Sequence, residues 1–352
     1  MSRTTTISKR RHFKSMLWGT VFILLSAMIL PLTGYLYVEV VSAQSASQEN
    51  PRANYWRAVR EGSSGYTAAS GPYTTNILVA NGGQNWRQVR NGPVASYGAG
   101  LLIFTLGVLA IFYLIRGSMK IEGGRSGRTV ERWSAFERSL HWYTAILFIV
   151  LAVTGLSMLF GRAVLIPILG LSGFSAWATL SITLHNYLGP AFSIGVVVMI
   201  LLWIKNNIWA SYDFEWVKQA GGMFSKHSHP PAGKANAGEK LFVFWLGLVF
   251  CGLAVIITGF ILDFPNYGQT RETMQLSQSV HAIASVVWVA FMLGHAYLGS
   301  IGVEGAFEGM TTGKVDANWA RQHHNVWYEQ VKHTESMDTS SAESSQGLKQ
   351  PS

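Results

Sequence analysis

Six uninterrupted apolar runs limit this chain to a small set of folds. A run of about 20 apolar residues is long enough to cross the hydrocarbon core of a bilayer as a single helix. The chain is 49% hydrophobic and only 13% charged, a composition typical of a protein embedded in lipid. The sequence therefore predicts an all-α membrane protein. The runs lie at 16–38, 99–115, 142–160, 180–204, 241–262 and 280–301.

The basic residues are sorted by loop and predict the orientation. Lys and Arg are abundant in the N-terminal tail, at 116–138 and at 205–240, whereas the short loops at 161–179 and 263–279 hold one arginine each. By the positive-inside rule, the rich segments are cytoplasmic. We therefore expect a multi-pass protein of the bacterial inner membrane, with a cytoplasmic C-terminus and with residues 44–98 in the periplasm. The net charge of +9 is then a topology signal, and no nucleic-acid partner is expected.

Shifts in composition divide the chain into segments. Residues 1–43 combine a basic start, an apolar run and a Val-Ser-Ala sequence, which predicts a signal peptide or a signal anchor. Residues 44–98 are polar and rich in Gly, Trp and Arg, and they form either a folded linker or a docking surface for a periplasmic partner. The remaining segments are predicted as a transmembrane helix at 99–116, a cytoplasmic link with an interfacial helix at 117–139, a four-helix domain at 140–305 and a cytoplasmic tail at 306–352, disordered after about 335.

Four of the ten histidines lie at or within the apolar runs. The other six, among them His323 and His324, lie in polar cytoplasmic segments, where a solvated surface position is expected. An imidazole inside a membrane is costly to bury, so it is a functional candidate by default. A hydrogen bond across helices is the ordinary alternative for any single one. The four candidates are His141, His185, His281 and His295.

The topology places these four histidines at two depths. His281 and His295 lie fourteen residues apart on one span, so they are separated by roughly 21 Å along the helix and about 40° around it. His141 begins the third span at the cytoplasmic side, and His185 lies near the outer end of the fourth. The predicted pairs are His141 with His295 and His185 with His281. This is the arrangement of a four-helix bundle holding two b haems, each iron bound by two imidazoles and therefore serving electron transfer.

Other residues bear on the same hypothesis. The single cysteine, Cys251, cannot supply the four thiolates of an iron–sulfur cluster, so such a cluster would belong to a partner. Glycines on the candidate spans suit the close approach of a flat macrocycle, although glycine also serves helix packing in membranes. These glycines are Gly155, Gly189, Gly259 and Gly294.

The start of the fifth span, "GKANAGEKLFVFW", is a candidate quinone site. Asn236 offers a side-chain amide and Gly238 an open backbone, beside the cytoplasmic level of His295. A quinone head group needs hydrogen bonds and a source of protons near a haem. An ordinary helix start, with Asn236 as the N-cap, explains the same residues equally well.

Several motifs, taken in order, resemble the gamma subunit, a cytochrome b, of respiratory formate dehydrogenase. They are "ERSLHWYTAILFIVLAVTGL", "TLHNYLGP", "KANAGEKLFVFW", "SVHAIAS", "LGHAYLGS" and the most specific one, "EGAFEGMTTGKVDANWARQHHNVWYEQV". The resemblance covers about 130–332. It implies that His141, His185, His281 and His295 are haem ligands and that residues 236–239, with His295, border a quinone pocket. Glu239 stands where some members of the family have glutamine.

The resulting functional hypothesis is a membrane electron-transfer subunit. It would pass electrons from a periplasmic iron–sulfur beta subunit, through two b haems, to a quinone near the cytoplasmic side. The catalytic alpha subunit, with molybdenum or tungsten, would oxidise formate, and no catalytic residue for that step is expected here. Three alternatives stay open: the cytochrome b of a nickel–iron hydrogenase or of another quinone-linked oxidoreductase, a metal-ion transporter, and a structural anchor.

Overall fold

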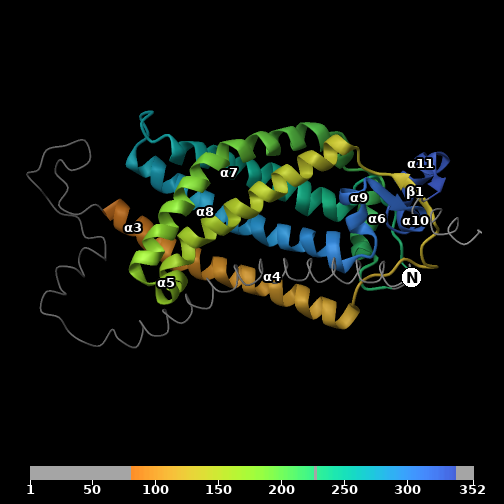
Figure 1. The fold of residues 1–352 in the computed structure, drawn as a ribbon, viewed down its shortest axis with the longest axis horizontal. Helices are drawn as coiled ribbons and strands as arrows, with labels where there is room; N and C mark the ends of the chain where they lie inside the picture. Colours follow the sequence, from red (N-terminus) through yellow and green to blue (C-terminus); the bar gives the residue numbers. More distant parts are fainter. Residues whose placement is uncertain (1–80, 226–227, 338–352) are drawn as a thin grey trace, which may run out of the picture. The chain divides into compact units, whose positions relative to one another are not determined.

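Four long apolar helical stretches dominate the described part of the chain. The computed structural model describes residues 81–225 and 228–337, traced in Figure 1. Within them, the all-α membrane class predicted from the sequence is confirmed. The apolar run at 16–38 and most of the segment 44–98 lie outside the described residues. The stretches long and apolar enough to span a membrane are Asn85–Arg116, Ala135–Asn207, Glu239–Asp263 and Arg271–Gly302.

The elements follow the chain in a mainly helical order. The α-helices are α3 (Asn81–Val89), α4 (Ala95–Arg116), α5 (Ala135–Trp203), α6 (Ser211–Lys218), α7 (Gly252–Asp263), α8 (Arg271–Tyr297), α9 (Ala306–Thr311), α10 (Ala317–His323) and α11 (Asn325–Val331). Wider π-helical turns form η1 (Arg90–Val94), η4 (Glu239–Cys251) and η5 (Leu298–Gly302). The strands are β1 (Arg128–Glu131), β2 (Lys314–Asp316) and β3 (Ser336–Met337).

Two predicted spans are the two legs of α5. The helix begins at a capping box between Ser134 and Glu137 and is interrupted at Gly170, whose φ of 69° and ψ of 176° only glycine adopts readily. The chain reverses there, seen in Figure 1 as the turn from yellow to green. The Tyr143 hydroxyl donates to the Ala191 carbonyl over 2.7 Å, which ties the legs together. The connection at 161–179 is therefore helical on both sides of one glycine.

The described residues divide into two compact units. The first contains 81–103, 149–189 and 266–279. Within it, Trp86 Nε1 donates to Gln278 Oε1 over 2.8 Å, and Arg90 Nη2 donates to the Met158 carbonyl over 3.1 Å. Residues 81–98, which the sequence assigned to a loop-rich periplasmic segment, are thus helical and packed within this unit.

The second unit contains 104–148, 190–265 and 280–337 among the described residues. An aromatic cluster packs the cores of α5 and α8 together. Trp288 on α8 lies 5.1 Å from Phe148 and 5.5 Å from Phe192, measured between ring centroids. Large apolar side chains on the outer helix faces, such as Leu114 and Phe250, remain exposed. Faces of this kind are expected to contact lipid.

A small antiparallel sheet joins segments that are far apart in sequence. The strand order is β2-β1-β3, and Val130 of β1 pairs with Val315 of β2. Both valines are fully buried, among Trp319, Trp327 and Tyr328. The cytoplasmic link predicted at 117–139 therefore contains a strand and then the first turns of α5. Residues 306–337 of the predicted tail are folded, and 338–352 lie outside the described residues.

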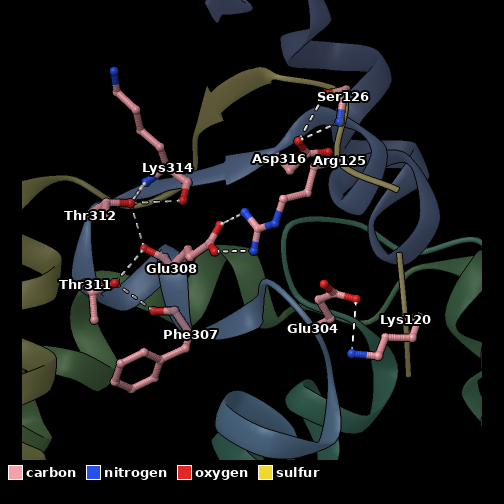
Figure 2. A network of polar contacts seen from close by, with 10 residues as sticks. All are labelled: Lys120, Arg125, Ser126, Glu304, Phe307, Glu308, Thr311, Thr312, Lys314 and Asp316. Carbon is pink, nitrogen blue, oxygen red and sulfur yellow. Dashed lines mark hydrogen bonds and ion pairs between the residues drawn. The ribbon is translucent and has the colours of Figure 1, made fainter. Parts of the chain in front are cut away.

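Polar contacts reinforce this small domain, as Figure 2 shows. Arg125 forms a two-pronged ion pair with Glu308, and Lys120 lies 3.6 Å from Glu304. Asp316 accepts from the backbone and the hydroxyl of Ser126 and also caps α10. Exposed ion pairs contribute little stability. The buried aromatic core therefore provides most of the free energy that holds residues 117–133 against the C-terminal segment.

Candidate haem centre

His141 and His295 lie close together within the second unit, with their ring planes tilted by 57°. His141 comes from the first leg of α5 and His295 from the last turn of α8, and their ring centroids are 6.1 Å apart. An imidazole nitrogen binds a first-row metal at about 2.0 to 2.1 Å, with the ring centroid about 1 Å further back. Two axial imidazoles on one iron therefore have centroids about 6 Å apart. The structure thus brings together this predicted pair at a separation that fits one iron.

The surroundings of this pair tie α5 to α9. Trp142, next to His141, donates from Nε1 to the Met310 carbonyl over 2.8 Å and packs edge-on against Phe307 of α9. The Nδ1 atom of His141 is buried without a hydrogen-bond partner among the described residues. The ring is therefore positioned by packing and by its neighbour.

His185 is held by a threonine on the other leg of α5. Thr154 Oγ1 lies 2.9 Å from His185 Nδ1. The adjacent Gly155 gives the ring room, because a Cβ atom at that position would lie 3.2 Å from His185 Cε1. Both contacts are within the first unit, so they fix where this histidine lies on its own helix pair.

His281 has the same kind of support in the second unit. Thr258 Oγ1 of α7 lies 3.1 Å from His281 Nδ1, and a Cβ at Gly259 would lie 3.4 Å from His281 Cε1. The sequence analysis identified Gly155 and Gly259 but missed both threonines, although each directly precedes its glycine. An added Cβ at Gly189 or Gly294 would meet no atom of the described residues within 4 Å.

His141 and His295 are a pair of donors, and this restricts what they can bind. Among residues 81–225 and 228–337, no group of three His, Cys, Asp or Glu side chains is arranged to hold a bare metal ion. A haem brings four equatorial nitrogen ligands of its own and needs only two axial ligands from protein. The donor set of His141 and His295 therefore fits a haem iron.

The candidate quinone residues form a helix start. Asn236 Oδ1 accepts from the Glu239 backbone N–H, and the Asn236 N–H donates to Glu239 Oε2, both over 2.9 Å. This is a reciprocal cap. The backbone of Gly238 is covered, because a Cβ there would lie 2.8 Å from the Trp216 ring. These contacts favour the N-cap explanation for Asn236 and Gly238.

Glu239 is the polar residue of this segment that interacts with a member of the pair His141 and His295. Its carboxylate interacts electrostatically with His295 and lies 3.4 Å from Arg132 Nη2. Arg132 is buried, and its guanidinium lies over the Trp319 ring, 4.9 Å from the centroid. No sequence pattern marks Arg132, since a lone arginine before a membrane helix is ordinary.

His324 is buried, contrary to the expectation of a solvated position. It is 2% exposed, and its Nδ1 lies 2.7 Å from the Gly233 carbonyl oxygen. Burial, and then the nearby Arg132 guanidinium, hold the pKa of His324 well below its usual value. The imidazole thus serves as a neutral packing group beside Trp319.

These features together define a helical membrane protein with a bis-histidine centre, the architecture of a b-type cytochrome. The chain belongs to the prokaryotic cytochrome b561 family, whose sequence pattern matches residues 132–313. Membership of a cytochrome b family implies that the protein binds haem b.

Three relatives named as formate dehydrogenase subunits align with the chain. The nitrate-inducible cytochrome b556(Fdn) subunit of Escherichia coli K12 is 27% identical over 215 residues, covering 59% of this chain and 94% of the relative. The cytochrome b556(fdo) subunit of the same strain is 28% identical over 209 residues, covering 58% and 95%. The cytochrome b556 subunit of Haemophilus influenzae is 25% identical, covering 54% and 79%. The resemblance found in the motifs is thereby confirmed.

Proposed function

We propose that this chain is the membrane cytochrome b subunit of a respiratory formate dehydrogenase. The observation that carries the proposal is the pair of His141 and His295, 6.1 Å apart between ring centroids, in a chain whose relatives are formate dehydrogenase cytochrome subunits. The complex would act as a formate:quinone oxidoreductase in the bacterial inner membrane.

Two b haems are proposed, each with two axial histidines. His141 and His295 would hold the inner haem, and His185 and His281 the outer one, as their depths along the spans require. Haem iron with both axial positions filled supplies one-electron transfer and leaves no open site for oxygen. The residues of this chain would fix the two irons at separate depths, and the aromatic cluster of Trp288, Phe148 and Phe192 packs α5 against α8.

The electron donor is proposed to be an iron–sulfur beta subunit at the periplasmic face. Cys251 is the only cysteine, and it is buried in the fifth span, so this chain cannot ligate a cluster itself. Formate oxidation would reside on a molybdenum or tungsten alpha subunit. Residues 44–98, proposed to lie in the periplasm with the C-terminus on the cytoplasmic side, would be available to these partners.

The electron acceptor is proposed to be a quinone near the cytoplasmic end of the bundle. Glu239 is the group best placed to serve it, because it interacts electrostatically with His295, its side chain is 37% exposed and its carboxylate lies 3.4 Å from Arg132 Nη2. Asn236 would contribute indirectly, by capping the helix that carries Glu239. A carboxylate in this position can deliver a proton from the cytoplasm to a reduced quinone.

Spectroscopy of the purified complex tests the proposal. Reduced-minus-oxidised spectra should show b-type bands, with two haems per chain by pyridine haemochrome analysis. Preparations from haem-replete cells that contain no haem would contradict the proposal and favour a metal-ion transporter or a structural anchor.

The choice of electron donor separates the proposal from its nearest alternative. In intact membranes, formate should reduce the haems within the turnover time of the complex, and hydrogen should not. Reduction by hydrogen alone would identify the cytochrome b of a nickel–iron hydrogenase. Copurification, followed by identification of the attached subunits, gives an independent reading of the same question.

A further inference from the structure

The two outer histidines share a supporting motif that occurs twice in the chain. Thr154-Gly155 contacts His185, and Thr258-Gly259 contacts His281. Each threonine binds the Nδ1 atom of its histidine, and each glycine faces the Cε1 atom of the same ring. The two motifs lie on different helices and in different compact units. One geometry that recurs in two separate places indicates a shared role.

The hydrogen bonds around each threonine assign the imidazole proton. Thr154 Oγ1 donates to the Val150 carbonyl over 2.9 Å, and Thr258 Oγ1 donates to the Ala254 carbonyl over 2.5 Å. A hydroxyl has a single hydrogen to donate. Its oxygen therefore accepts from the ring, which places the imidazole proton on Nδ1 and the lone pair on Nε2. This is the tautomer that binds a metal through Nε2.

The glycines set the position of each ring. At Gly155 the nearest atoms to an added Cβ are His185 Cε1 at 3.2 Å and Nδ1 at 3.9 Å. At Gly259 they are His281 Cε1 at 3.4 Å and Nδ1 at 3.7 Å. The edge of the ring formed by Cε1 and Nδ1 thus faces the glycine of the neighbouring helix, with Nδ1 directed at the threonine and Nε2 directed away from it.

His141 of the inner pair lacks this support. Within the described residues, the Nδ1 atom of His141 is buried with no hydrogen-bond partner. A hydrogen bond from Nδ1 increases the electron donation of the opposite nitrogen to a metal, so partners of this kind tune the metal. More strongly donating ligands stabilise ferric iron relative to ferrous iron, and they lower the midpoint potential.

We propose that Thr154 and Thr258 are positioning residues that fix the metal-binding tautomer of His185 and His281 and lower the midpoint potential of the outer haem below that of the inner haem. This inference rests on the proposed dihaem function. This difference in midpoint potential would favour electron flow from the periplasmic side toward the quinone. Two threonine hydroxyl groups, which bind the histidines and not the haem, would set it.

The test compares Thr154→Val and Thr258→Val with Thr154→Ser and Thr258→Ser in the purified complex. Valine keeps the shape of threonine and removes the hydroxyl, whereas serine keeps the hydroxyl. Redox titration should show that each valine variant raises the midpoint potential of the outer haem by about 59 mV. For one electron, this shift corresponds to a tenfold change in the ferric-to-ferrous ratio at a fixed potential. The low-spin electron paramagnetic resonance signal of the outer haem should shift as well. The serine variants should match wild type, and the inner haem of each variant serves as the folding reference.

A matched control is Thr179→Val. Thr179 makes the same bond to the carbonyl four residues earlier, to Ser175 over 3.0 Å, but it is exposed and contacts no histidine. This variant should leave both potentials unchanged. Loss of the outer haem in the valine variants, with retention in the serine variants, also supports the proposal.

Two results would overturn the inference while leaving the proposed function intact. The first is two haems with unchanged potentials and spectra in both valine variants. The second is loss of the outer haem in the serine variants as well as in the valine variants. Fewer than two haems in the wild-type complex would instead contradict the proposed function itself.

Discussion

Replacing the histidines of α8 one at a time should remove one haem and spare the other. His281 and His295 are fourteen residues apart on one helix, which corresponds to roughly 21 Å along the axis. Substitutions more than about 7 to 10 Å apart, with no shared partner, act independently. His295→Ala and His281→Ala should therefore each reduce the haem content from two per chain to one, and the double variant should contain none.

The pairing makes a sharper prediction for double variants. His141 and His295 face the same site, 6.1 Å apart between ring centroids. His141→Ala, His295→Ala and the variant carrying both should all contain one haem with the same spectrum, because the second change removes nothing further. His141→Ala combined with His281→Ala should contain no haem.

Pyridine haemochrome analysis and low-temperature difference spectra of purified complexes measure these outcomes. In the His295→Ala complex, formate should still reduce the remaining haem, while quinone reduction should fall to background. In the His281→Ala complex, the remaining haem should stay oxidised after formate is added. A doubly substituted His141 and His295 variant with less haem than either single variant would refute the pairing.

Three further predictions concern Lys240, His323 and Glu239. Lys240→Met should destabilise the complex by about 3 to 5 kcal/mol in thermal unfolding, because Lys240 Nζ lies 2.7 Å from the fully buried Asp213 carboxylate. Adding Asp213→Leu should restore most of the lost stability. Equal stability of the single and double variants would contradict this prediction. Burial, and then the nearby charges, lower the pKa of His323 to about 4 from an ordinary 6.5. Between pH 6.5 and 4 the unfolded chain then binds more protons than the folded one, so the free energy of unfolding should fall as the pH drops, by up to about 1.4 kcal/mol per pH unit. His323→Gln should flatten this dependence of stability on pH in urea titrations. Glu239→Gln keeps the helix cap but removes the charge beside Arg132. Quinone reduction should therefore slow by roughly 10²-fold, with both haems retained. An unchanged rate in a formate-to-quinone assay would exclude the proposed role of this carboxylate.

The sequence alone identified the chain as a membrane protein and the four histidines as candidate haem ligands. A run of apolar residues long enough to span a bilayer is a local property, and five of the six predicted runs lie in the four long helical stretches of the structure. The cost of burying an imidazole in lipid is equally local, so His141, His185, His281 and His295 were identifiable without a fold. The spacing of His281 and His295 followed from helix geometry, because they share one helix.

Only the tertiary structure decided what each histidine contacts. Thr154 lies 31 residues from His185, and Thr258 lies 23 residues from His281, so no local pattern marks either threonine as a hydrogen-bond partner. The strand at 128–131 was hidden for the same reason, because its partners at 314–316 and 336–337 lie near the other end of the chain. Asn236 was visible in the sequence, but a polar residue before an apolar run fits a binding site and a helix cap equally well. Only the positions of Glu239 and Trp216 in space favoured the cap. Local chemistry thus identified the groups that are costly to bury, whereas the partners that balance this cost depend on contacts between distant segments.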